Sequence, residues 1–358
     1  MKQLIKPKAL QKGDTIAVVS LSWGGAGQFL DYYHCAKKQF ETAFDVKLIE
    51  MSHTLSDPRV LSEHPEYRLD DLMQAFLDPN VKAILTTIGG DDTIRLLSLM
   101  TDDHFQVIQS HPKIFMGMSD TTVNHFMCYK AGISSFYSPS LMFGYAEFGG
   151  IPDFIIQNTK KTLFSTQNIG NLPESSQYII ESFDWGMTDF SPRQRMLSPK
   201  WKYIQGTHPV QGRLLGGCME VLSMMNGSNI WPTGSDWDNA ILFLETSEER
   251  QPPSQLKYFL RNLGSQGILN RIKGILFARP GGEFSEKEVL EQEKWLNQYS
   301  QFDEVLLQVA KEYNRMDLCI VTHMDFGHTV PQLILPMGML TKIDPIRQRI
   351  SFLERAVE

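Results

Sequence analysis

Apolar and polar residues alternate in blocks along the first half of the chain, rather than residue by residue. Short runs of apolar and β-branched residues precede longer stretches in which apolar residues recur every three or four positions. The runs predict buried strands, and the longer spacing predicts amphipathic helices. The predicted strands are 15–20, 46–50, 81–88 and 113–116, and the predicted helices are 28–44, 66–76, 93–100 and 121–129.

These strands show little polar alternation and are separated by helices, which favours a parallel sheet covered on both faces. The pattern predicts an α/β fold in which residues 1–165 form an N-terminal doubly wound parallel-sheet domain. Ligands of such sheets bind beyond the carboxyl ends of the strands. Functional residues are therefore expected where the predicted strands end.

The pattern changes after residue 165. Residues 166–203 are rich in Ser, Asn, Pro, Asp and aromatic residues, which predicts a linker and an aromatic loop, with one possible strand at 177–181. Residues 204–358 are expected to form a smaller mixed α/β domain, because helices come early there and strands cluster late. Its predicted strands are 212–215, 240–244, 274–277, 318–321, 332–335, 339–343 and 348–353, and its helices are 219–225, 253–263 and 286–299.

Composition excludes several classes of protein. The 358 residues are 42% hydrophobic and 21% charged, which is ordinary for a folded chain rather than a disordered one. The net charge of −7 gives no general attraction for a nucleic acid polymer, and no apolar run reaches the roughly 18 residues of a membrane span. Four cysteines without a C-x-x-C pair, and no signal-peptide pattern, predict a cytoplasmic protein without a membrane partner.

The segment Gly117-Met118-Ser119-Asp120-Thr121 lies where a predicted strand gives way to a predicted helix. A serine on such a turn projects its hydroxyl above the sheet, beside the free N–H groups of the helix N-terminus. Hydrolase nucleophiles are held this way in G-x-S-x-G turns, although Thr121 replaces the last glycine here. The simpler interpretation is that Ser119 or Asp120 caps the helix.

A serine nucleophile needs a base and a group that orients the base. His328 is the candidate base, in a predicted loop between two late strands. Glu245 is the candidate orienting group because it ends strand 240–244, with Glu248 and Glu249 close behind as rivals. The simpler interpretations are a solvent-exposed loop histidine and a charge at a helix N-terminus.

Two glycine-rich turns follow predicted strands, where glycine lets the backbone approach a ligand closely. Gly89-Gly90 is the candidate for half of an oxyanion hole, or an ordinary strand-to-helix turn. Gly24-Gly25-Ala26-Gly27 follows the first predicted strand, and Glu50 ends the second, which is the layout of a dinucleotide-binding site. The G-x-G-x-x-G spacing of such sites is absent, however. A nucleotide-binding protein using the loop from Gly24 to Gly27 is therefore the alternative of another class.

A metal centre has weak support. His323, Asp325 and His328 lie near one another in sequence, but no H-E-x-x-H pattern is present. Neither a metal nor another cofactor is expected.

A series of short motifs runs through nearly the whole chain. They are KGDT with IAVVS, Tyr67-Arg68 through Asp78-Pro79, TTIGGDD, MGMSDTT, GRLLGGCMEVL, ILFLETSEE, GILFARP and DFGHTVPQLILPMG. In this order and spacing they resemble the LD-carboxypeptidase family of serine peptidases, and most closely its microcin-immunity group.

The resemblance implies a Ser–Glu–His triad of Ser119, Glu245 and His328, and an oxyanion hole from the N–H groups of Gly90 and Asp120. It also implies an N-terminal α/β domain with a smaller, mixed, barrel-like C-terminal domain. The serine would come from the first domain and its partners from the second. A homodimer in the cytoplasm is expected from the same resemblance.

Two residues concern the substrate. Cys218 follows Gly216-Gly217 where the family usually has asparagine, so one polar substrate contact is expected to differ. Trp185, in the aromatic loop, matches the position of an aromatic residue that stacks on the substrate's nucleotide in the microcin-immunity group. The simpler interpretations are a small buried Cys218 and a Trp185 packed under its own loop.

The sequence therefore predicts a serine peptidase or amidase that acts near the C-terminal end of a small substrate. The long aromatic segment and the GGDD turn favour an aminoacyl-nucleotide-like or peptidyl-nucleotide amide, and a detoxification role. The alternative within the family is an LD-carboxypeptidase that trims muropeptides and releases D-alanine.

Overall fold

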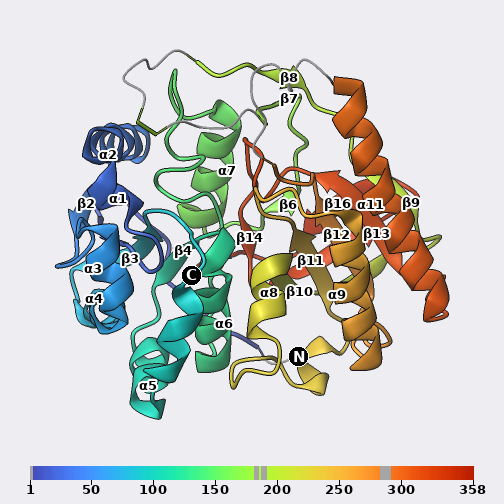
Figure 1. Ribbon diagram of the computed structural model, residues 1–358, viewed down its shortest axis with the longest axis horizontal. Helices are drawn as coiled ribbons and strands as arrows, with labels where there is room; N and C mark the ends of the chain where they lie inside the picture. The colour runs from blue at the N-terminus through green and yellow to red at the C-terminus, as the bar shows by residue number, and fades with distance from the viewer. Residues whose placement is uncertain (1–2, 181–184, 187–191, 283–291) are drawn as a thin grey trace.

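Five parallel strands form most of the N-terminal sheet in the computed structural model, which describes residues 3–180, 185–186, 192–282 and 292–358 (Figure 1). Their order is β2-β1-β3-β4-β5, and a sixth strand, β14, pairs antiparallel with β5. The strands are β1 (Thr15–Val19), β2 (Lys47–Glu50), β3 (Val81–Thr86), β4 (Ile114–Gly117), β5 (Phe136–Tyr137) and β14 (Leu335–Pro336). Helices on both faces bury β1 and β3, which explains why the sequence of these strands is almost continuously apolar.

Helices cover both faces of this sheet, which confirms the doubly wound arrangement. α2 packs beside α7 on one face, and α4, α5 and α6 follow one another on the other (Figure 1). The helices are α1 (Gly25–Gln28), α2 (Leu30–Phe44), α3 (Pro58–Glu63), α4 (Pro65–Leu77), α5 (Asp102–Ser110), α6 (Thr122–Ala131) and α7 (Asp153–Leu163), with short 3-10 helices η1 (Thr93–Ser98) and η2 (Ser119–Thr121).

The second sheet is mixed, as predicted, and has eight strands in the order β6-β16-β15-β10-β11-β12-β13-β9. β10 to β13 run parallel, and the outer strands are antiparallel to their neighbours. Its strands are β6 (Gly170–Asn171), β9 (Lys202–Gln205), β10 (Val210–Cys218), β11 (Ile241–Glu245), β12 (Gly274–Ala278), β13 (Cys319–Met324), β15 (Leu340–Asp344) and β16 (Arg349–Phe352). Helices α8 (Met219–Met225), α9 (Pro253–Ser265) and α11 (Gln292–Glu312) and the 3-10 helix η3 (Gly234–Trp237) belong to this half.

Part of the predicted linker is built into the second sheet. β6 pairs with β16, and β9 pairs with β13. Between them, β7 (Gln177–Tyr178) and β8 (Met196–Leu197) form a separate two-stranded sheet. The segment is therefore only partly a connection between the two halves.

Several elements differ from the sequence prediction. Residues 93–98 form a 3-10 helix rather than an α-helix, and α3, α5, α7 and β5 were not predicted. The spacing of apolar residues does not predict α5, because Ile108 is its one buried side chain. The first part of the helix predicted at 286–299 lies outside the described residues, and the described helix α11 extends from Gln292 to Glu312.

The two halves share one core. A single cluster of buried apolar side chains extends through both, and α6 packs against α8 and β10. β14 comes from the late part of the chain but extends the N-terminal sheet beside β5. The domain limits at residues 165 and 203 remain predictions.

The carboxyl ends of the strands define where a ligand fits. β1 and β3 are neighbours at the point where the strand order reverses, which is where doubly wound sheets bind ligands. The segments that follow β1, β3 and β4 carry Trp23, Gly89-Gly90 and Ser119. In the second sheet, β11 ends at Glu245.

β10 and β11 approach so closely that a Cβ at Gly216 would lie 1.8 Å from the carbonyl oxygen of Phe243. We expect Gly216→Ala to lower the free energy of unfolding by about 1–3 kcal/mol, because the strand that ends at Glu245 must move. Urea unfolding followed by circular dichroism measures the change. Gly234→Ala is the control, since a Cβ there meets only Arg271 side-chain atoms at 3.5 Å or more. Equal unfolding midpoints for the two variants would contradict this prediction.

Candidate active site

Ser119 lies in the turn between β4 and α6, where the sequence placed a strand-to-helix turn. Its φ angle is +59°, in the left-handed region that residues other than glycine rarely adopt. A strained turn of this kind is typical of hydrolase nucleophiles. Glycines make room around it, since a Cβ at Gly117 would lie 2.3 Å from Thr86 Oγ1 and one at Gly89 would lie 2.8 Å from Ser119 Cβ. Ser119 therefore lines a cavity above the sheet.

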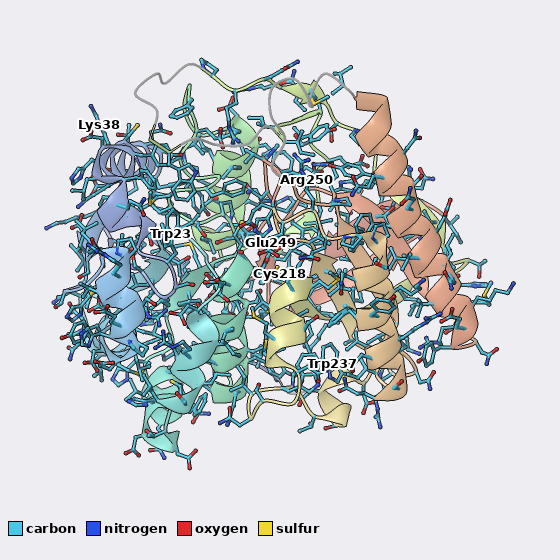
Figure 2. All side chains as sticks on the ribbon, in the orientation of Figure 1. Trp23, Lys38, Cys218, Trp237, Glu249 and Arg250 are labelled. Atoms are coloured by element: carbon cyan, nitrogen blue, oxygen red, sulfur yellow. The ribbon has the colours of Figure 1, made fainter. Side chains whose placement is uncertain are left out.

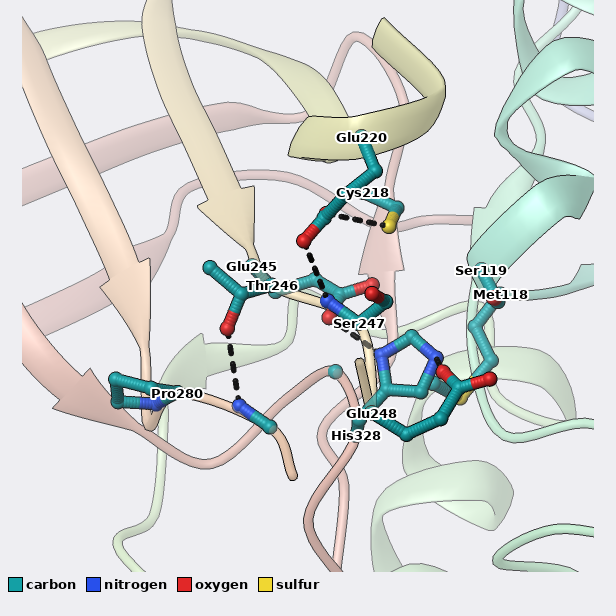
Figure 3. A network of polar contacts seen from close by, with 12 residues as sticks. Met118, Ser119, Cys218, Glu220, Glu245, Thr246, Ser247, Glu248, Pro280 and His328 are labelled. Atoms are coloured by element: carbon teal, nitrogen blue, oxygen red, sulfur yellow. Dashed lines mark hydrogen bonds and ion pairs between the residues drawn. The ribbon is translucent and has the colours of Figure 1, made fainter. Parts of the chain in front are cut away.

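His328 and Glu245 meet at the edge of the same cavity (Figure 3). The Glu245 side chain is fully buried, and its Oε2 lies 2.6 Å from Nδ1 of His328. A carboxylate on Nδ1 orients the imidazole, and here Nε2 lies 3.1 Å from Oε2 of Glu248. Within the described part of the chain, no hydrogen bond joins Ser119 Oγ to His328. The structure thus brings Ser119 and His328 to one cavity, with Glu245 directly behind the histidine.

Carboxylates on both sides of the imidazole control its protonation. Burial alone would lower the pKa of His328, but the charges and hydrogen bonds of Glu245 and Glu248 outweigh it and raise the pKa well above 6.5. The hydrogen bond with His328 also lowers the pKa of Glu248 to about 2. Both carboxylates therefore favour the protonated imidazolium form of His328.

Tyr137 connects the serine turn to Glu245, although no motif in the sequence points to it. Its hydroxyl donates to Glu245 Oε1 and accepts a hydrogen bond of 3.1 Å from the backbone N–H of Ser119. Burial and then the charge of Glu245 raise the pKa of Tyr137 well above 10, so the hydroxyl keeps its proton. Tyr137 belongs to β5, a strand of two residues that is too short to leave a periodic signal.

The two N–H groups expected to form an oxyanion hole lie on turns beside Ser119. Gly90 lines the cavity with a φ of +143°, and a Cβ there would lie 2.4 Å from Ser22 Oγ. The Asp120 carboxylate accepts a 2.7 Å hydrogen bond from the backbone N–H of Thr93. Among described residues, the N–H groups of Gly90 and Asp120 donate no hydrogen bond. Their role as oxyanion donors remains a prediction.

The cavity has a volume of about 340 Å³ and is open to solvent, which suits a small-molecule site. One wall is aromatic, because the ring of Trp185 lies 5.3 Å from that of Trp23 and 6.0 Å from that of Phe29. Trp23 belongs to the N-terminal half (Figure 2). The structure brings Trp185 to the cavity, but its stacking on a substrate remains a prediction.

Cys218 is buried beside Glu245 and is not among the described residues that line the cavity. Its thiol donates a hydrogen bond of 3.2 Å to Glu220 Oε2 (Figure 3). Burial, and then the charges of Glu245 and Glu220, raise the pKa of the Cys218 thiol well above 9, which disfavours a thiolate nucleophile. The structure therefore does not bring this predicted binding residue to the cavity, and the small buried role fits its place.

The glycine-rich loop from Gly24 to Gly27 is used for close packing. A Cβ at Gly24 would lie 2.8 Å from Pro58 Cα, and one at Gly27 would lie 2.4 Å from the carbonyl oxygen of Ser56. These contacts explain the glycines without a nucleotide. The glycines of this loop therefore no longer indicate a dinucleotide site.

The side chains weighed as a metal centre have separate partners. Nε2 of His323 lies 3.3 Å from Asp303, Asp325 forms a buried ion pair with Arg279, and His328 binds Glu245. In the described part of the chain, no group of three or more His, Cys, Asp or Glu side chains is placed to hold a metal ion. No helix in the same part is long and apolar enough to cross a membrane.

Known proteins match both the sequence and the fold. Residues 16–138 match the LD-carboxypeptidase N-terminal domain, and residues 211–343 match the LD-carboxypeptidase C-terminal domain. The crystal structure of an MccF-like protein from Streptococcus pneumoniae, in complex with AMP, is 31% identical with a TM-score of 0.80. That alignment covers 95% of this chain and 98% of the other.

Two further relatives cover most of the chain. The microcin C7 self-immunity protein MccF of Escherichia coli is 27% identical over 80% of this chain and 78% of its own length. A structure of MccF with aspartyl sulfamoyl adenosine has a TM-score of 0.82 at 22% identity, covering 99% of this chain and 100% of that one. A Bacillus subtilis protein named a probable murein peptide carboxypeptidase is 26% identical over 93% of this chain and 89% of its own length.

Both family domains occur here in their order, and identity reaches 31% over nearly the full length. The mixed C-terminal sheet and the parallel N-terminal sheet agree with the MccF fold. From its sequence and its fold, this chain belongs to the LD-carboxypeptidase family of serine hydrolases.

Proposed function

We propose that this protein is a serine amidase with Ser119 as nucleophile, His328 as general base and Glu245 as the group that orients the base. The observation that carries the proposal is the 2.6 Å contact of Glu245 with Nδ1 of His328, a histidine that lines the same cavity as Ser119. Nε2 is the nitrogen that accepts the proton of Ser119 in this mechanism, and in the structure it pairs with Glu248. The lack of a direct Ser119–His328 hydrogen bond is compatible with this role, because such bonds are often long before substrate binds.

The arrangement supports acyl transfer in two steps. Ser119 Oγ attacks the amide carbonyl carbon while its proton passes to Nε2 of His328. The N–H groups of Gly90 and Asp120 stabilise the oxyanion, each contributing about 3–4 kcal/mol. The C–N bond then breaks as Nε2 returns the proton to the leaving nitrogen, and water hydrolyses the acyl-enzyme by the same path.

An aminoacyl-nucleotide-like amide is the substrate class that the cavity favours, in a detoxification role. MccF binds aspartyl sulfamoyl adenosine, and the Streptococcus pneumoniae protein binds AMP. Here the wall of Trp185, Trp23 and Phe29 offers a surface on which a base can stack. Muropeptide trimming is the second candidate, favoured by the Bacillus subtilis relative. A homodimer and a cytoplasmic location remain predictions.

Ser119→Ala is expected to lower kcat by at least about 10³-fold, since the nucleophile of a triad is lost. Aspartyl sulfamoyl adenosine and a muropeptide tetrapeptide serve as substrates, and mass spectrometry measures the cleavage products. Ser98→Ala is the control, because Ser98 is exposed and its hydroxyl bonds the carbonyl oxygen of Arg95. Full activity of Ser119→Ala would refute the mechanism, and release of D-alanine alone would replace the detoxification role by muropeptide trimming.

Tyr137→Phe is expected to lower kcat by about 10-fold to 100-fold with little change in KM, because Glu245 loses a hydrogen bond to its charge. The more basic carboxylate should hold the imidazolium more tightly, so the acidic limb of the pH–rate profile should move to higher pH. Tyr145→Phe is the matched control, since this buried hydroxyl bonds Thr159, whose side chain does not line the cavity. An unchanged pH profile for Tyr137→Phe would contradict the assignment.

Trp185→Ala is expected to raise KM for aspartyl sulfamoyl adenosine by about tenfold or more, because a stacking surface for the base is removed. The tetrapeptide has no base, so its KM should stay the same. Trp185→Phe keeps an aromatic face and should recover most of the affinity. A parallel loss of affinity for both substrates would mean that Trp185 supports the wall of the cavity instead of the nucleotide.

A further inference from the structure

Glu248 occupies the nitrogen of His328 that the proposed mechanism needs free. Its Oε2 lies 3.1 Å from Nε2, while Nδ1 is held at 2.6 Å by Glu245 (Figure 3). An imidazole between two carboxylates donates from both nitrogens, and Nε2 then has no lone pair for a proton from Ser119. Without substrate, the general base His328 is therefore blocked by Glu248, which follows Glu245 by three positions.

The two carboxylates differ in how firmly they are held. Glu245 is 0% exposed and also accepts from Tyr137, whereas the Glu248 side chain is 49% exposed and lines the cavity. Solvent competes for an exposed ion pair, so Glu248 is the partner that can be exchanged. A substrate that enters the cavity meets this carboxylate beside the reacting groups.

The charges around the imidazole of His328 favour the binding of a cationic group of the substrate. Among the described residues, Glu245 and Glu248 are the titratable groups in contact with His328, and Glu248 follows the end of β11 by three positions. Behind Glu245 lie Tyr137 of β5, and Cys218 and Glu220 at the start of α8, none of which carries positive charge. Arg193 also lines the cavity, but its guanidinium pairs with the buried carboxylate of Glu147.

We propose that Glu248 is a specificity-determining carboxylate, which releases Nε2 of His328 when an ammonium group on the acyl part of the substrate takes the place of the imidazolium. The enzyme would thus select amides whose acyl residue carries a free amine within reach of the Glu248 carboxylate. This inference rests on the proposed function of Ser119, His328 and Glu245.

Charge and protons balance in this exchange. The ammonium enters and becomes the cation paired with Glu248, and the Nε2 proton of His328 leaves to solvent. The neutral imidazole then accepts the proton of Ser119 Oγ in the acylation step. No oxidant, metal or second substrate is needed.

Two substrate classes carry such an amine. In an aminoacyl nucleotide, the free amine is the α-amine, which is attached to the Cα next to the scissile carbonyl. In a muropeptide that contains a diamino acid, the free amine is at the end of the side chain. The shared chemistry is an ammonium within reach of Oε2 of Glu248. Separate arms of one experiment distinguish the two sources.

The first arm compares alanyl sulfamoyl adenosine with its N-acetyl form, and the second compares a lysine-containing tetrapeptide with its side-chain-acetylated form. For the wild-type enzyme, we expect kcat/KM to favour the free amine by about tenfold or more in one arm, because a hydrogen bond to a charge is lost on acetylation. In Glu248→Gln, this preference should disappear. Glu249→Gln is the matched control, since its neighbouring carboxylate bonds Gln251 and is not among the described lining residues.

The pH dependence gives a readout that a structural role would not move. With the acetylated probes, Glu248→Gln should shift the acidic limb of kcat/KM to lower pH, because His328 loses one of the two carboxylates that favour its charged form. Titration of His328 by NMR should show the same shift without any substrate. Glu249→Gln should leave both measurements at the wild-type values.

Binding of the uncleaved probes separates this inference from the proposed function. In Ser119→Ala, calorimetry should show tighter binding of the free-amine probe, and in Ser119→Ala with Glu248→Gln it should not. If the proposed function fails, no variant cleaves any probe, while binding and the NMR titration still report on Glu248. Wild-type selectivity in Glu248→Gln, or an unchanged His328 titration, overturns the role of Glu248.

Discussion

The buried negative charge of Glu245 is the constraint around which the site is arranged. A carboxylate removed from water costs several kcal/mol unless hydrogen bonds and an opposite charge compensate it. Tyr137 supplies the first hydrogen bond and His328 supplies the second together with the charge. The loop carrying His328 passes directly over this carboxylate, because a Cβ at Gly327 would lie 2.7 Å from Glu245 Cβ. Each oxygen of Glu245 is thus satisfied by a residue from a different part of the chain.

The backbone brings these partners together through the short strand β5. In β5, Tyr137 pairs with Gly117 of β4 on one side and with Leu335 of β14 on the other. Ser119 follows Gly117 by two positions, and Leu335 follows His328 by seven. One residue therefore fixes the turn of the nucleophile and the strand that returns from the histidine loop. This pairing explains why a late strand belongs to the early sheet.

Local features of the site could be predicted from the sequence, because they arise from neighbouring residues. Ser119 lies between an apolar strand and a helix, and Glu245 ends an apolar run. Tyr137 could not be found this way, since its role depends on a strand of two residues and on contacts with Ser119 and Glu245. The glycine-rich turn at Gly24 suggests a nucleotide site that the structure does not support, also because a long-range contact decides its role. A backbone that approaches Pro58, as at Gly24, leaves the same sequence signal as one that approaches a nucleotide.

Glu245 and Glu248 show how position gives one residue type two different roles. With a protonated His328 between them, the three side chains carry a net charge of −1. An oxyanion formed beside Ser119 adds a second negative charge, and like charges at such distances repel strongly in a partly buried site. Glu245 cannot leave, because Tyr137 and His328 hold it away from water. The charge that can change is the exposed one, so relief must come either from movement of Glu248 or from a cation that arrives with the substrate.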